Sequence, residues 1–112
     1  MKAISTLFIS IMFQFILVQP ILAADMDAAA TEALMKKSNC FKCHAIDKKK
    51  DGPSFKQTAA KYKGKADAEQ KLFVHLTTSP KIEVDGNEEL HEMLKTKNEA
   101  EIRQVIAWIL SH

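Results

Sequence analysis

Two cysteines and a histidine within five consecutive residues, Cys40-Phe41-Lys42-Cys43-His44, could do redox chemistry. This Cys-x-x-Cys-His pattern is typical of covalent haem attachment. The two thiols add to the two vinyl groups of the haem, and the gap of two residues suits the spacing of those groups. The histidine is then carried under the porphyrin ring, where its imidazole can bind iron as the proximal ligand. The segment therefore predicts one covalently attached haem c, with its iron.

A Cys-x-x-Cys pair can also form a disulfide, a thioredoxin-type redox pair or half of a zinc site. A thioredoxin-type pair needs a βαβ setting, and the sequence predicts no strand. A structural zinc site needs four ligands, but Cys40 and Cys43 are the chain's two cysteines and no second Cys/His pair is present. The haem interpretation is therefore preferred.

The beginning of the chain is typical of a secretory signal peptide. A positive start at Met1-Lys2 precedes the apolar run 3–18, and small residues near Ala23 and Ala24 suit cleavage after either one. The alternative is an uncleaved N-terminal membrane anchor, because the run approaches spanning length. We expect a signal peptide over residues 1–24. Haem c is attached outside the cytoplasmic membrane, so the periplasm of a Gram-negative bacterium is the expected location.

The remaining residues, 25–112, have the length of one small domain. Such a chain has a thin apolar core of its own, which a covalently held porphyrin would complete. The formal net charge of the chain is only +2 and aromatic residues are few. These properties do not support nucleic-acid binding.

Apolar periodicity and capping residues predict an all-α fold with about four helices around one haem. The last helix has the clearest apolar stripe, because its four aliphatic residues recur at the spacing of one helical face. The expected helices are about 27–37 after Asp27, 55–62 between Ser54 and Gly64, 68–76 after Asp67, and a last one begun by Asn98 or by a Thr96/Glu99 capping box, with Ile102, Val105, Ile106 and Ile109 inward.

Several of these segments together resemble the small bacterial class I cytochromes c. The resemblance covers nearly the whole domain and is weakest over 77–97. The matching segments are Cys40-x-x-Cys43-His44-Ala45-Ile46-Asp47, Gly52-Pro53-Ser54-Phe55, Ala59-Ala60-Lys61-Tyr62, Gly64, Ala68-Glu69 and Ala107-Trp108-Ile109-Leu110-Ser111.

The resemblance implies a fold in which the first and last helices cross near the haem edge. It implies a one-electron carrier, rather than an enzyme, that shuttles electrons between respiratory redox partners in the periplasm. It also implies that the carbonyl of Pro53 accepts a hydrogen bond from Nδ1 of His44, which orients the imidazole and strengthens it as an iron donor.

The distal iron ligand is where the sequence departs from this family. Relatives usually place a methionine in a proline-flanked loop upstream of the tryptophan in the final helix, at a spacing that falls between His91 and Met93. No proline follows Pro80, so the stiff loop that presents a weak thioether is missing. Imidazole binds iron strongly without such a loop, which favours His91. The methionine that relatives usually place at this position favours Met93. Met93 could instead fill the core, and His91 could be solvated. On balance we favour His91, and both stay candidates.

Two other functions depend on the distal side. A weak or absent distal ligand would make the chain a haem-based protein that binds or senses a small ligand. A distal histidine in an open pocket would favour a peroxidase, but no arginine lies near His91 in the sequence. His75 could sit at the edge of the core or bond a haem propionate, and the terminal His112 is expected to be solvated.

The haem surroundings are predicted from the same helices. The Phe41-Lys42 insert is expected to face outward, and the haem pocket is expected to be built from Ile46, Phe55, Leu72, Phe73 and Trp108. Lysines flank the motif, including Lys42 and the run 48–50. An acidic redox partner could therefore dock transiently at the haem edge, steered by charge, and we expect a monomer.

Overall fold

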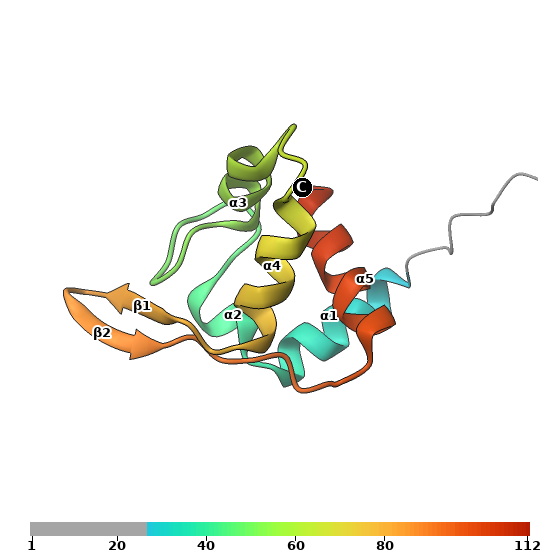
Figure 1. Ribbon diagram of the computed structural model, residues 1–112. Helices are drawn as coiled ribbons and strands as arrows, with labels where there is room; N and C mark the ends of the chain where they lie inside the picture. Colours follow the sequence, from blue (N-terminus) through green and yellow to red (C-terminus); the bar gives the residue numbers. More distant parts are fainter. Residues whose placement is uncertain (1–26) are drawn as a thin grey trace, which may run out of the picture.

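The computed structural model describes residues 27–112, and it is mostly helical, as predicted. The signal peptide predicted for residues 1–24 lies outside the described part. None of the helices in the described part has the length and apolar character needed to cross a membrane. In chain order (Figure 1) the elements are α1 (Ala28–Lys37), α2 (Cys40–Cys43), α3 (Phe55–Tyr62), α4 (Ala68–Thr77), β1 (Lys81–Val84), β2 (Asn87–Leu90) and α5 (Glu99–Leu110).

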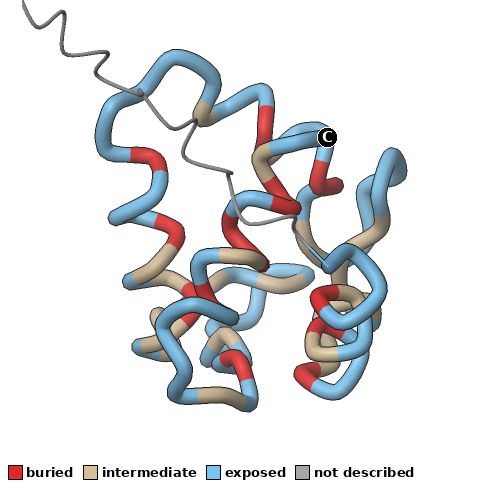
Figure 2. The backbone as a smooth tube through the Cα atoms, turned by 90° about the vertical axis from the view of Figure 1, so that its right-hand side faces the viewer, coloured by how far each residue is buried: buried red, intermediate tan, exposed pale blue. Residues whose placement is uncertain are grey.

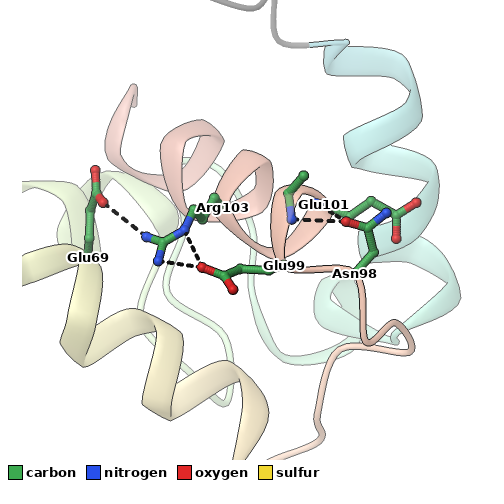
Figure 3. A network of polar contacts seen from close by, with 6 residues as sticks. Glu69, Asn98, Glu99, Glu101 and Arg103 are labelled. Atoms are coloured by element: carbon green, nitrogen blue, oxygen red, sulfur yellow. Dashed lines mark hydrogen bonds and ion pairs between the residues drawn. The ribbon is translucent and has the colours of Figure 1, made fainter.

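Three long helices begin at the capping residues that the sequence predicts. The Asp27 side chain accepts a hydrogen bond from the Ala30 backbone, and Ser54 forms a reciprocal capping box with Gln57. Asn98, rather than a Thr96/Glu99 box, caps α5 (Figure 3). These bonds satisfy backbone N–H groups that a helix leaves without partners.

Helix α5 is the centre of the core. It packs against α1, α3 and α4, each of which has buried residues. Figure 2 shows how the buried positions are distributed along the chain. The predicted inward stripe is buried, with Val105 fully enclosed and Ile106 1% exposed. The buried apolar cluster consists of Met35, Phe55, Leu72, Leu76, Leu94, Ile102, Val105, Ile106, Trp108 and Ile109.

The expectation of no strand is wrong over residues 81–90, where β1 and β2 form an antiparallel hairpin. The register pairs Lys81 with Leu90 and Val84 with Asn87. Asp85 and Gly86 form the turn with φ of 50° and 79°, the pair of positive values that a tight two-residue hairpin needs. An Asp-Gly pair next to a segment that alternates apolar and polar residues is a known hairpin signal. That signal was present in the sequence and was missed.

Candidate functional site

The Cys-x-x-Cys segment forms α2, a single helical turn held at both ends. Asn39 precedes it with φ 62° and ψ 16°, and the His44 N–H donates to the Cys40 carbonyl at 3.0 Å. The Gly52 N–H donates to the Cys43 carbonyl at 2.8 Å. Both cysteines are half-buried free thiols, and burial raises the pKa of Cys40 to about 11. The two cysteines are thus presented one helical turn apart, and the Cys40 thiol is protonated at neutral pH.

Phe41 does not face outward, contrary to the prediction for the insert. Its ring packs edge-on against Phe55 and Trp108, with ring-centre distances of 5.8 Å and 6.2 Å. Phe55 and Trp108 are themselves 5.1 Å apart and nearly fully buried. Lys42 is exposed, as expected. The motif is therefore attached to the core by one aromatic side chain, which spacing within the motif could not predict.

The ring of His44 is held on two sides. Its Nδ1 lies 2.7 Å from the Pro53 carbonyl, the contact that the family resemblance implies. A carbonyl can only accept, so Nδ1 carries a proton, and in the neutral ring Nε2 then has the free lone pair. Phe55 stacks on the ring at 5.4 Å between centres. A Cβ added to Gly52 would lie 2.5 Å from Cε1 of His44, so only glycine fits there.

His91 lies next to His44, although they are far apart in the sequence. The ring centres are 6.1 Å apart and the planes are inclined by 54°. A metal–imidazole bond is about 2 Å long, so two imidazoles on opposite sides of one ion have ring centres about 6 Å apart. Nδ1 of His91 is buried without a hydrogen-bond partner. Burial, followed by the nearby His44, lowers the pKa of His91 and favours the neutral form, which is the form that binds iron.

Met93 is not a core residue, so the core-filling interpretation is wrong. The segment after β2 is not helical, and Leu90 and Met93 are 66% and 49% exposed. Only Leu94 of this segment is buried, and its N–H donates to the Leu76 carbonyl at 3.0 Å.

The other two histidines each contact an aromatic ring. His75, on α4, lies 4.2 Å from His91 between ring centres, and burial, with smaller effects of the neighbouring histidines, lowers the pKa of His75 to about 4. Sequence reasoning missed this pair because the hairpin between them brings them together. His112 is exposed, but its ring centre lies 4.1 Å from that of Trp108, with the planes inclined by 48°, and its Nδ1 lies 2.8 Å from the Trp108 carbonyl.

These residues fit a haem. The two thiols lie on one turn, His44 presents a free nitrogen, and His91 contributes a second imidazole at the separation that one metal ion requires. Of the predicted pocket, Phe55, Leu72 and Trp108 are buried and Phe73 is partly buried, whereas Ile46 is 43% exposed.

Comparisons with known proteins agree with this chemistry. The family described as Cytochrome c matches residues 28–112. Cytochrome c-551 of Azotobacter vinelandii is 37% identical over 84 residues, which cover 72% of this chain and 95% of that protein.

Two solved structures share the fold. The class 1 cytochrome MtoD of Sideroxydans lithotrophicus ES-1 has a TM-score of 0.72 and 48% identity, covering 76% of this chain and 95% of that one. Cytochrome c552 of Nitrosomonas europaea has a TM-score of 0.56 and 29% identity, covering 71% and 96%.

Proposed function

Because the chain belongs to the cytochrome c family, and is therefore a small electron-carrier cytochrome with one covalently attached haem c, we propose that it shuttles single electrons between respiratory redox partners in the periplasm. In this proposal the chain is a carrier rather than an enzyme, and it works as a monomer. The observation that best supports a closed, six-coordinate carrier is the separation of 6.1 Å between the rings of His44 and His91.

We assign the residues as follows. Cys40 and Cys43 would hold the haem through two thioether bonds, in each of which the sulfur would bond to one vinyl carbon and the thiol hydrogen would go to the other carbon of that vinyl group. His44 is the proximal ligand, oriented by the Pro53 carbonyl. His91, rather than Met93, is the distal ligand.

When bound, the haem supplies the redox chemistry, because its iron exchanges one electron between ferric and ferrous states. The chain contributes ligands and their orientation. The hydrogen bond from Nδ1 of His44 to Pro53 fixes the ring and increases the donor strength of Nε2. Phe41, Phe55 and Trp108 pack beside the motif and keep water away from that side. Ligation by two imidazoles would give the haem iron a lower reduction potential than ligation by a histidine and a methionine.

The basic residues around the motif support transient docking of an acidic partner at the haem edge. Lys42 and the lysines of 48–50 are exposed. Lys50 also donates to the Phe41 carbonyl at 2.7 Å, so this lysine stabilises the motif as well as adding charge.

The carrier role is tested by a redox titration of the purified protein. We expect a single reversible wave with one electron per haem and no spectral change when carbon monoxide is added to the reduced form. Carbon monoxide binding at an open distal position would instead support the ligand-binding or sensing function.

The distal ligand is tested by two variants. His91→Ala should convert the ferric protein to a high-spin form, whereas Met93→Leu, the matched control that removes the thioether, should leave the low-spin spectrum unchanged. The reverse pattern would assign Met93, and two unchanged spectra would exclude both residues.

A further inference from the structure

The hairpin formed by β1 and β2, residues 81–90, projects from the helical body (Figure 1). The main packing contacts among the described residues join helix to helix and β1 to β2, and none of these joins the hairpin to a helix. An isolated two-stranded hairpin is only marginally stable in water. The core therefore does not explain why this hairpin is present.

The hairpin is strongly acidic. It has four carboxylates and one lysine, which leaves a formal charge of −3, and the lysine already forms an ion pair with Glu88 at 2.6 Å. The carboxylates lie on both faces, because Glu83 pairs with Glu88 while Glu89 pairs with Ile82. An exposed apolar residue, Leu90, lies at its base with 66% of its surface exposed. An exposed apolar side chain beside charged side chains of one sign is typical of a transient interface.

The base of the hairpin leads directly into the haem site. The His91 N–H donates to the Pro80 carbonyl at 2.9 Å. The Leu94 N–H donates to the carbonyl of Leu76, near the end of α4. The proposed distal ligand is therefore the residue that immediately follows β2. A protein bound to the hairpin would lie close to the distal side of the haem.

From this geometry we infer that the hairpin of residues 81–90 is the docking site for a second redox protein, one whose own docking surface is basic and includes an apolar contact for Leu90. This inference rests on the proposed carrier function. The lysines near the motif suit an acidic partner. The chain therefore has one acidic and one basic docking surface, and its electron donor and its electron acceptor would bind to different ones.

The test uses reduced holoprotein and two oxidants of opposite charge, basic mitochondrial cytochrome c and ferricyanide. In each reaction one electron leaves the reduced protein, and either the ferric cytochrome becomes ferrous or ferricyanide becomes ferrocyanide. The variant is Glu83→Lys with Glu89→Lys, which reverses charge on both faces and retains the ion pair of Glu88. The control is Glu32→Lys on α1, a helix on the other side of the fold from the hairpin (Figure 1).

We expect the hairpin variant to react with mitochondrial cytochrome c about tenfold more slowly at low ionic strength. The difference should disappear at high salt, because exposed charges are then screened. The control should react at close to the wild-type rate. A second readout is the amide NMR spectrum of the labelled protein during titration with the basic cytochrome, where the largest shifts should fall in residues 81–92.

An unchanged rate in the hairpin variant, or shifts confined to the lysine-rich segment, would overturn the inference. Self-association of the wild type at low salt, abolished by the hairpin variant, would also overturn it by assigning the hairpin to a second copy of the chain. Failure of the wild type to reduce either oxidant would instead contradict the carrier function itself.

Discussion

At the scale of single residues, Gly52 is the position where the smallest change should have the largest effect on the haem site. A methyl group there would lie 2.5 Å from Cε1 of His44 and 2.9 Å from its Nδ1. We expect Gly52→Ala to push the imidazole away from the Pro53 carbonyl and to lower the free energy of unfolding by about 1–3 kcal/mol, the range for overpacking. Urea unfolding and the midpoint potential of the holoprotein measure both effects.

The matched control is Gly86→Ala in the hairpin turn. Its φ is +79° and an added Cβ meets nothing within 4 Å, so it should cost about 1–2 kcal/mol in backbone strain and leave the potential unchanged. Equal potentials in wild type and Gly52→Ala would show that the close approach does not position His44.

The chemistry of the motif could be predicted from the sequence because covalent attachment depends on neighbouring residues. The orientation of Phe41 could not, since the contacts that draw it inward come from Phe55 and Trp108 in other helices. The same reason kept His91 and Met93 open as alternatives. Their separation from His44 depends on how the chain folds back after α4.

At the scale of elements, we expect the cap of α5 to contribute more to stability than the ion pairs on its surface. The Asn98 side chain accepts from the backbones of Ala100 and Glu101. We expect Asn98→Ala to lower the free energy of unfolding by about 1 kcal/mol, measured by urea denaturation.

The control for this variant is Glu69→Ala, which removes a contact of 3.5 Å between Glu69 and Arg103 (Figure 3). Both side chains are more than half exposed, and Arg103 keeps its closer pair with Glu99 at 2.7 Å. The effect should stay within about 0.5 kcal/mol. A larger loss from Glu69→Ala than from Asn98→Ala would contradict this ranking.

Helices α1, α3 and α5 could be predicted closely because each is specified by local residues, a capping side chain and an apolar stripe. Asp67 precedes α4, as expected, but its side chain makes no capping hydrogen bond. Helix α4 extends only to Thr77, one residue beyond the expected end. The hairpin was harder to predict because two strands of four residues carry little periodicity, so that its main local signal is the Asp85-Gly86 pair.

At the scale of the whole molecule, we expect the predicted signal peptide, residues 1–24, to be removed from the domain. We predict that the mature protein begins at Ala24 or Asp25 and carries one haem, as measured by intact mass of the coloured protein from the periplasm. A chain that begins at residue 25 without a leader should accumulate in the cytoplasm without haem. A coloured membrane-bound protein of full-length mass would show that the segment is an uncleaved anchor.

The distribution of charge also belongs to this scale. Lysines surround the motif and carboxylates occupy the hairpin, while the formal net charge is only +2. The sequence showed this segregation, but only the fold shows that the acidic segment projects as a hairpin whose base adjoins His91.

The central claim is an electron carrier whose iron is held between His44 and His91. The most direct test is the absorption spectrum of the purified wild-type ferric protein, recorded into the far red. We expect a low-spin spectrum without the weak far-red band that marks an iron–thioether bond. A low-spin spectrum with that band would contradict the claim by assigning Met93, and a high-spin spectrum would contradict it by leaving the distal position open.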